Sequence, residues 1–458
     1  MTESITTMLL IAVIALPTVA TLALAISSWF RMMPGEAQIN AIVSIAFGGA
    51  TVCCAALLWI LASSHTPLVS IQLGSFFEVS GYAFHWRLTG DHLSLPFAGF
   101  SSLLLGVIGA FSRRYLHREP GYLRFYMLLS LFGAGVALMV LGGSMELIFF
   151  GWEIIGLTSA LLIAFFHDRR LPVAHGFRAF VTYRMCDIGL LSACVWLHHT
   201  TGGSSMELSG GAAPWATLDV PRTAVGATVV GLLMLLGAMG KGAQIPFGGW
   251  LPKAMEGPTP SSAIFYGAIS VSLGPYLLLR SAHILEASPI ATIAVIVLGA
   301  ATAAHGTFVG RAQSDIKSAL AYASMTQIGL IFVEIGLGFR YLALAHIVGH
   351  AALRSLQILR SPSLLHDYQQ LERAMGGEVP RPGGHLERYV PKRLQPWLYR
   401  HALERGYFDA ILRDYVVAPF LHTIGRIEAL DAAWVRLISG EVTSVSTDDT
   451  TIALEKTR

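Results

Sequence analysis

Long runs of apolar residues alternate with short polar segments over the first 360 positions of the chain. A helix needs about 20 apolar residues to cross a bilayer, and most of these runs reach that length. The pattern therefore predicts an all-α polytopic membrane protein. We place about 11 transmembrane helices near residues 6–30, 38–63, 93–112, 122–142, 145–166, 174–198, 223–250, 260–281, 288–310, 316–336 and 339–359.

Two segments near the N-terminus need separate interpretations. The first 20 residues lack a basic region and a clear cleavage site, so we interpret them as part of the first span, not as a signal peptide. Residues 68–90 alternate in polarity and carry β-branched and aromatic side chains. This alternation predicts a short β-hairpin outside the membrane core.

The composition changes near residue 361, where a charged tail begins. Apolar residues recur there at helical spacing, but acids and arginines interrupt them too often for a span. One or two amphipathic helices, on a partner or at the membrane surface, fit this pattern. Pro419 is expected to break or kink them, and the last ~15 residues are expected to be flexible. We divide the chain into two N-terminal helices with the hairpin (1–92), a transmembrane core (93–360) and a tail (361–458).

The composition excludes several classes of protein. The chain of 458 residues is 54% hydrophobic and 13% charged, whereas soluble proteins carry about 25% charged residues. A net charge of +3 without a basic stripe argues against nucleic acid as a partner. The four cysteines suit neither a zinc site nor a disulfide framework. Without a nucleotide fingerprint or a nucleophile constellation, we expect no cofactor, no metal and no independent enzyme activity in this chain.

Basic residues are distributed unevenly between alternate loops. The positive-inside rule assigns the richer loops to the cytoplasm, which predicts a periplasmic N-terminus. An odd number of spans then predicts a cytoplasmic tail. The richer loops carry Arg31, Arg113, Arg114, Arg118, Arg124, Arg169, Arg170, Arg178, Lys253, Arg311 and Lys317, whereas Arg87, Arg222, Arg280 and Arg340 are isolated on the other side.

Ionisable residues inside the predicted spans are the candidate functional residues. Such groups normally face the interior of the helix bundle and pair with one another. Glu153 and Lys241 are opposite charges on different spans, so we expect them to be partners. Arg184 and Asp187 are three residues apart and share one helix face. A purely structural ion network is the alternative interpretation.

Lys241 also lies in a sequence that should break its helix. Gly240 and Gly242 flank it, and Pro246 follows. A broken helix frees backbone groups, which is tolerated only against protein or an aqueous cavity. Broken helices mark ion and substrate sites in transporters, so this break strengthens the case for an ion path.

Other polar residues lie in the last predicted spans. His346 and His350 are four residues apart on one helix face, but two histidines without a third ligand do not make a metal site. A hydrated relay or hydrogen bonds between helices fit them better. We expect His305 to be a satisfied core histidine and Glu334 to reach the interface from near a helix end.

Six motifs carry a resemblance to a known family. The chain resembles the antiporter-like subunits of respiratory complex I, nearest to the L subunit, and the large subunit of Mrp sodium/proton antiporters. The similarity runs in order from about residue 85 to 375, and "ERGYFDAILRDYVVAPFL" resembles the C-terminal region of the L subunit. The motifs are "DHLSLPFAGF", "RRYLHREPGYLRFYMLLSLF", "IFFGWEIIGLTSALLIAFF", "GKGAQIPFGGWLPKAMEGPTPSSA", "SDIKSALAYASMTQIGLIF" and "LAHIVGHAALRSL".

The resemblance implies roles for individual residues. Glu153 and Lys241 match the ion pair of the family's proton path, and Arg184 and Asp187 match the charges of the next span. Two positions depart from the family pattern: Tyr266 replaces a common histidine, and Arg354 replaces a lysine. Arginine does not practically deprotonate. The other matched positions are Lys317, His346 and His350.

The resemblance also implies an architecture. The family fold contains two inverted five-helix repeats, and here the second repeat lacks the expected second broken helix with its own lysine. A shortened L-like subunit with a tail resembles the DabB-type membrane subunits of bacterial inorganic-carbon transporters. The segment "RSPSLLHDYQQLERAMGG" is similar to that subgroup.

The expected partner of a DabB-type subunit is a DabA-like cytoplasmic zinc protein. The pair would sit at the bacterial inner membrane and use a gradient of protons or sodium to drive CO2 hydration and bicarbonate accumulation. Zinc would then reside in the partner. The alternatives are a complex I-like or Mrp-type antiporter subunit and a non-conducting membrane scaffold for a soluble enzyme.

Overall fold

The computed structural model describes most of the chain, which forms two compact units, Met1–Gly406 and Tyr407–Arg458. The C-terminal segment predicted to be flexible, most of the 360–377 motif and the side chain of Tyr266 lie outside the described residues. Our division at residues 92 and 360 stays a prediction. The described residues are 2–32, 34–79, 82–201, 205–207, 215–313, 315–361, 373, 375 and 390–439.

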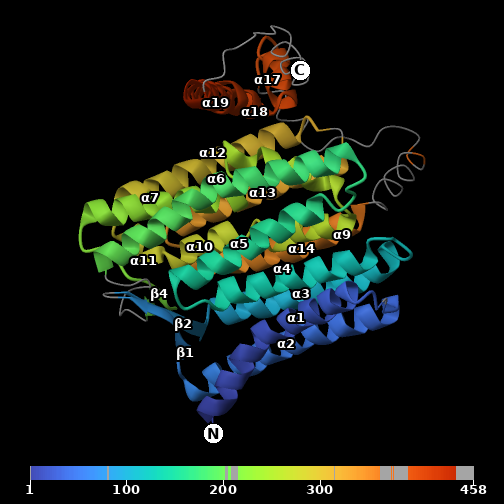
Figure 1. Cartoon of the computed structure of the whole chain (residues 1–458), viewed down its shortest axis with the longest axis vertical. Helices are drawn as coiled ribbons and strands as arrows, with labels where there is room; N and C mark the ends of the chain where they lie inside the picture. Colours follow the sequence, from blue (N-terminus) through green and yellow to red (C-terminus); the bar gives the residue numbers. More distant parts are fainter. Residues whose placement is uncertain are drawn as a thin grey trace. The chain divides into compact units, whose positions relative to one another are not determined.

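The fold is mostly helical, as the apolar runs predict. In the described part of the chain, 10 helices are long and apolar enough to cross a membrane. In the first unit these helices run side by side and their loops gather at two ends (Figure 1). They are α1 (Thr2–Trp29), α2 (Glu36–Ser64), α3 (Ser94–Tyr115), α4 (Tyr122–Leu141), α5 (Met145–Ile163), α6 (Arg170–Thr201), α7 (Ala224–Lys241), α12 (Pro289–Gly310), α13 (Ile316–Gly336) and α14 (Arg340–Leu359).

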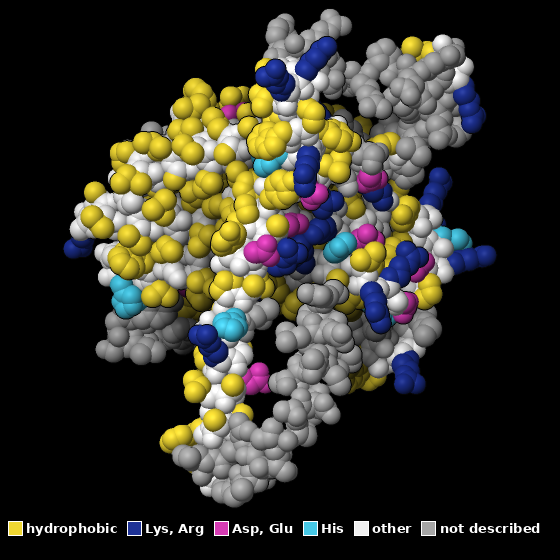
Figure 2. All heavy atoms as spheres, turned by 90° about the horizontal axis from the view of Figure 1, so that it is seen from above, with side chains coloured by type: hydrophobic (Ala, Val, Ile, Leu, Met, Phe, Trp, Pro, Cys, Tyr) yellow, Lys and Arg dark blue, Asp and Glu magenta, His cyan; other side chains and the backbone are white. Residues whose placement is uncertain are grey.

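Side chains that face outward from these helices are largely apolar. On α6, for example, Phe177, Ile188 and Val195 are all more than half exposed. Figure 2 shows hydrophobic side chains spread over broad areas of one face of the molecule. Soluble monomers rarely expose patches of this extent, so the surface fits a protein embedded in lipid.

The predicted span near 260–281 is the main difference from the expected helices, because it is interrupted. A proline has no N–H and is accommodated most easily in the first turn of a helix. Pro275 therefore makes α10 begin at Leu273, and an irregular turn precedes it. The segment comprises α9 (Thr259–Ser262), the π-helical η3 (Ala263–Ala268) and α10 (Leu273–Arg280), followed by α11 (Ala282–Glu286).

Local capping explains where several long helices start. The side chains of Ser144, Thr223, Ser288 and Asp315 each accept a hydrogen bond from the backbone N–H three residues later. Such caps satisfy one of the free donors at a helix N-terminus and contribute about 1 kcal/mol each. The first two caps fix the beginnings of α5 and α7, which carry candidate site residues.

The predicted hairpin is confirmed. Strand β1 (Leu68–Val79) pairs antiparallel with β2 (Tyr82–Asp91), with register shifts between Gln72 and Phe77. Gly74 lies inside this bulge at φ +141°, a conformation that side chains disfavour. A second, two-residue pair joins β3 (Met206–Glu207) to β4 (Thr217–Leu218).

Helices also form in the tail. The last α-helix of the first unit is α17 (Gln395–Leu403), and the turn η4 (Arg405–Tyr407) covers the sequence boundary between the units. The second unit contains α18 (Phe408–Leu412), the π-helical η5 (Arg413–Val417) and α19 (Ala418–Ser439). The π-helical turn directly precedes Pro419, as its missing N–H predicts. Apolar residues along α19 are exposed within this unit: Phe420, Ile424, Ile427, Leu430, Trp434 and Ile438.

Candidate functional site

Three neighbouring helices bring the predicted intramembrane charges together. α5 packs against α6, and α6 packs against α7. Glu153 comes from α5, Arg184 and Asp187 come from α6, and Lys241 is the last residue of α7. The sequence therefore identified the residues that meet, although it paired Glu153 with the wrong cation.

Arg184 stands between the two acids. It forms an ion pair with Glu153 and a second one with Asp187, whose Oδ2 lies 2.9 Å from its Nη2. The three-residue spacing predicted the second pair. The predicted Glu153–Lys241 pair is wrong, because Arg184 takes the carboxylate of Glu153.

Asp187 is the junction of the cluster. Its side chain is 4% exposed, and its Oδ2 lies 4.0 Å from Lys241 Nζ. The indole N–H of Trp152 donates to the other oxygen over 2.5 Å. The carboxylate of Asp187 thus interacts with two cations and an indole. These contacts link the four charges in the order Glu153–Arg184–Asp187–Lys241.

Lys241 is fully buried among aromatic rings. Its Nζ lies 4.5 Å from the ring centroid of Trp152 and 4.9 Å from that of Tyr183. Cation–π contacts stabilise an ammonium group more strongly when water is excluded. Among the described residues, Lys241 Nζ has no hydrogen-bond partner, so the aromatic faces and the distant Asp187 carry its interactions.

A glycine on α5 makes room for the cations. A Cβ added at Gly156 would lie 2.9 Å from Arg184 Nη2 and 3.1 Å from Lys241 Nζ. Real Cβ atoms essentially never approach other heavy atoms to within 3.0 Å. Because Gly156 has no side chain, the charged ends of Arg184 and Lys241 can both lie close to the backbone of α5 at this position.

The predicted helix break after Lys241 is confirmed. The backbone groups that it frees are satisfied by other parts of the chain: Trp250 Nε1 donates to the Gly240 carbonyl over 2.9 Å, and Gln244 Nε2 donates to the Gly242 carbonyl over 2.8 Å. Pro246 lies within the break, before the short helices η1 (Phe247–Gly249), α8 (Trp250–Lys253) and η2 (Ala254–Glu256). Gly240 also permits close packing, because a Cβ there would lie 2.6 Å from that of Cys186.

The remaining predicted residues lie on α13 and α14, outside this cluster. Lys317 Nζ donates to Thr259 Oγ1 over 3.3 Å. His346 contacts two side chains of α13, Glu334 at 2.8 Å and Gln327 at 2.9 Å. Glu334 therefore contacts a histidine of the next helix, and our expectation that it reaches the interface stays a prediction.

The next two polar residues of α14 follow at intervals of one helical turn. His350 is 7% exposed, and its Nε2 has no hydrogen-bond partner in the described part of the chain. Arg354 donates to Gln357 over 2.8 Å. The structure thus places His346, His350 and Arg354 along one helix but does not bring them into contact with Lys241.

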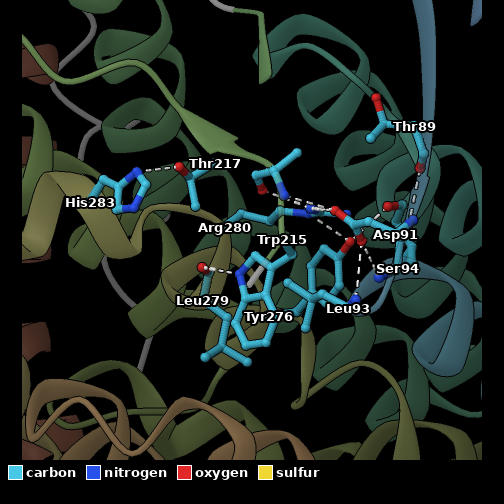
Figure 3. Close-up of polar contacts among 12 residues, drawn as sticks. Thr89, Asp91, Leu93, Ser94, Trp215, Thr217, Tyr276, Leu279, Arg280 and His283 are labelled. Carbon is cyan, nitrogen blue, oxygen red and sulfur yellow. Dashed lines mark hydrogen bonds and ion pairs between the residues drawn. The ribbon is translucent and has the colours of Figure 1, made fainter. Parts of the chain in front are cut away.

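Sequence reasoning missed a second buried charge cluster. Arg280 and Asp91 are both fully buried and face one another (Figure 3). Nη1 of Arg280 lies 2.5 Å from Asp91 Oδ2, and Nη2 lies 3.1 Å from Oδ1. Backbone and side-chain donors of Ser94 and the backbone of Ala216 complete the carboxylate's shell. We had counted Arg280 as an isolated loop arginine, since its acid lies 189 positions away.

Arg340 was also counted as a loop arginine. It is 9% exposed and forms an ion pair with Glu286 at the end of α11. Arg280 ends α10 and Arg340 begins α14. Their acidic partners, Asp91 and Glu286, are distant in the chain, so residue spacing could not identify either pair.

The chain is similar to membrane subunits of respiratory complexes. Residues 143–376 match the family described as NADH:quinone oxidoreductase/Mrp antiporter, TM. The chain is 34% identical over 323 residues to NADH-ubiquinone oxidoreductase chain 5 of Schizophyllum commune, covering 70% of this chain and 46% of the relative. It is 31% identical over 361 residues to NAD(P)H-quinone oxidoreductase chain 5 of Picosynechococcus sp., covering 77% and 54%. The chain thus spans about half the length of these curated relatives.

Solved structures support the same fold. The Mrp complex from Dietzia sp. matches with a TM-score of 0.63 and 25% identity, covering 77% of this chain and 37% of the other. An archaeal respiratory membrane complex, the membrane-bound sulfane sulfur reductase, matches with a TM-score of 0.61 and 19% identity, covering 76% and 70%. The second similarity concerns the fold alone.

Proposed function

The chain belongs to the NADH:quinone oxidoreductase/Mrp antiporter transmembrane family, and from this premise we propose that it is a cation-translocating membrane subunit, with the proton as the expected ion. The observation that carries the proposal is the buried chain of alternating charges that ends at the helix break, Glu153–Arg184–Asp187–Lys241. A complex I-like or Mrp-type subunit is thus our leading interpretation.

The geometry suits proton exchange at Lys241. Lysine can release a proton, whereas arginine does not practically deprotonate. The partners also differ in distance, since Asp187 lies 2.9 Å from Arg184 but 4.0 Å from Lys241. When Lys241 loses its proton, Arg184 is the one cation left beside Asp187 among these four residues, and this changes the balance of the whole chain of charges. We propose that this redistribution couples proton movement to the rest of the protein.

The path beyond the cluster is part of the same proposal. Lys317, His346, His350 and Arg354 would carry or bias a hydrated route on the other side of the helix break. His350 is the strongest of these candidates, because it is buried and its Nε2 lacks a partner among the described residues. Buried polar groups of this kind commonly bind internal water.

Proton flux into liposomes that contain the purified complex tests the proposal. Lys241→Met removes the charge with little change of length, and Lys241→Arg keeps the charge but not the exchangeable proton. We expect at least a tenfold loss of flux in both variants. Arg311→Gln, which removes an exposed charge at the end of α12, is the control and should stay near the wild-type rate. Wild-type flux in both Lys241 variants would show that Lys241 is not on the conduction path, whereas absence of flux in the wild-type complex would indicate a scaffold.

A finer proposal concerns the partner. We infer a DabA-like zinc protein that docks on the tail, with CO2 hydration and bicarbonate accumulation as the coupled process. Two observations support it: the tail motifs resemble that subgroup, and α19 exposes an apolar stripe within its unit. The stripe fits a protein interface. A bacterial inner membrane with a periplasmic N-terminus stays our prediction for the location.

Copurification distinguishes the possible partners. A zinc-containing soluble protein that is retained by the wild type and lost in Ile427→Glu supports the DabA-type assembly. An exposed polar position of the same helix, Glu428→Gln, serves as the control. Copurification of several further membrane subunits instead would indicate a complex I-like or Mrp-type assembly.

A further inference from the structure

Two interrupted helices meet at the end of α7. A Cβ added at Gly274, in α10, would lie 2.6 Å from the Ala238 carbonyl oxygen and 3.3 Å from the backbone of Gly242. The irregular turn at Ile269–Ser272 therefore lies close to the break that follows Lys241. Backbone irregularity at membrane depth is tolerated where protein or an aqueous cavity satisfies it, and here two such breaks are adjacent.

Tyr183 is the second aromatic neighbour of Lys241, beside Trp152. Its ring is fully buried, and Lys241 Nζ lies 4.9 Å from its centroid. The ring of Trp250 packs against its edge, with centroids 4.9 Å apart and planes at 77°. The position of the Tyr183 ring is thus fixed by a cation and an indole, neither of which engages its hydroxyl.

The hydroxyl of Tyr183 lies near the interrupted segment α9–η3–α10. The side chain that interacts with it there is Ser270, which lies in the irregular turn before α10. Both residues are fully buried, and neither Tyr183 Oη nor Ser270 Oγ makes a hydrogen bond of good geometry in the described part of the chain. Buried hydroxyls without a direct partner are normally bridged by water.

We propose that Tyr183 and Ser270 form a relay of hydroxyl groups that connects Lys241 to the interrupted segment α9–η3–α10. A hydroxyl accepts a proton at its oxygen and releases its own proton on the other side, so the relay carries a charge without any net chemical change. Because α14 packs against η3, the relay leads from the α5–α7 cluster toward the helix that carries His350. The inference rests on the proposed cation translocation and names two residues that act in it.

Two conservative substitutions remove the hydroxyls and little else. Tyr183→Phe keeps the aromatic face beneath Lys241 and its contact with Trp250, and Ser270→Ala removes a single oxygen. We expect each variant to lower proton flux in liposomes at least fivefold per assembled complex. Ser270→Thr keeps a hydroxyl at this position and should retain flux within twofold of the wild type, a rescue that a packing role does not predict.

Matched controls come from buried residues outside the site. Tyr126 is fully buried in α4 and donates to the Gly109 carbonyl, and Ser112 is fully buried in α3 and donates to that of Ile108. Tyr126→Phe and Ser112→Ala should lower the melting temperature but leave the flux per assembled complex near that of the wild type.

The possible outcomes separate this inference from the proposed function. If Lys241→Met abolishes flux while Tyr183→Phe and Ser270→Ala both stay within twofold of the wild type, the relay is wrong and cation translocation stands. If the wild type carries no flux, both proposals are wrong. Should Tyr183→Phe fail to assemble, the comparison of Ser270→Ala with Ser270→Thr decides the matter.

Discussion

Arg280 binds both carboxylate oxygens of Asp91, and neither side chain is accessible to solvent. The pair joins the end of β2 to the last residue of α10. Tyr276 supports it, because its hydroxyl accepts from Arg280 Nε over 3.0 Å and donates to the Val140 carbonyl over 2.7 Å. With this geometry the hairpin and the interrupted helix are fixed to one another.

Removing one member of this pair should destabilise the protein strongly. Loss of one partner leaves a buried charge unpaired, which typically costs about 3–5 kcal/mol. We expect Asp91→Asn and Arg280→Gln to lower the melting temperature of the detergent-purified protein markedly. The double variant should be less destabilised than the sum of the two, since it leaves no charge uncompensated. Additive losses would contradict the pairing.

The same pair predicts a dependence of stability on pH. Burial alone would raise the pKa of Asp91, but the charge and hydrogen bonds of Arg280, together with those of Ser94, hold this pKa below its ordinary value. A carboxylate with a lowered folded-state pKa contributes stability above its unfolded pKa of about 3.9, and this contribution is lost as pH falls through the folded value. The difference in melting temperature between wild type and Asp91→Asn should therefore be constant from neutral pH to about pH 5 and shrink below about pH 4. A difference that shrinks near neutrality would contradict this assignment.

A double-mutant cycle can test which charges are partners in the α5–α7 cluster. Because Arg184 contacts Glu153 directly, Glu153→Gln and Arg184→Gln should be coupled by about 0.5–3 kcal/mol in thermal or chemical unfolding. The cycle of Glu153→Gln with Lys241→Met should give a smaller coupling. Equal coupling energies in the two cycles would instead support the direct Glu153–Lys241 pair that the sequence suggested.

The indole of Trp152 offers a test of Asp187. Trp152→Phe keeps an aromatic face for Lys241 but removes the N–H that donates to Asp187 Oδ1. The carboxylate should then move more freely between its two cations, so we expect the flux to fall by a few fold while assembly is retained. Trp250→Phe, which removes a different buried indole donor, that to the Gly240 carbonyl, indicates how much of the effect is general. An unchanged flux in Trp152→Phe would show that the indole does not position Asp187.

The space at Gly156 can be filled to separate the two cations. The methyl group of Gly156→Ala would press on Arg184 Nη2 and Lys241 Nζ, and we expect at least a fivefold loss of flux. Gly48→Ala in α2 is the control, because its Cβ meets nothing within 4 Å. Alanine is favoured over glycine in helices by up to about 1 kcal/mol, so this control should be neutral or slightly more stable. A wild-type flux in Gly156→Ala would show that the close approach of the cations is not needed.

The sequence predicted those features that depend on local chemistry. Gly240, Gly242 and Pro246 predicted the break of α7, because glycine and proline act on the backbone at their own positions. The spacing of Arg184 and Asp187 predicted their contact for the same reason. Hydropathy, however, did not separate a continuous span from the α9–η3–α10 segment, where Pro275 forces a new helix start inside an apolar run.

Partner choice depended on how the helices are rotated against each other. The sequence placed Glu153 and Lys241 in the same bundle, but only the packing of α6 between them shows that Arg184 intervenes. The pairing of Arg280 with Asp91 was not predicted for a related reason. Its acid lies at the far end of the hairpin, and no periodicity connects positions so distant in the chain.

The surroundings of Lys241 also bear on ion selectivity. A dehydrated metal cation needs several oxygen ligands to replace its hydration shell, whereas a proton needs only a single lone pair. In the described part of the chain, the contacts of Lys241 Nζ are two aromatic faces and one carboxylate oxygen that Arg184 already engages. A site with so few available oxygens discriminates by ligand number, so we expect sodium to be excluded from the step at Lys241 even if it is bound elsewhere in an assembly.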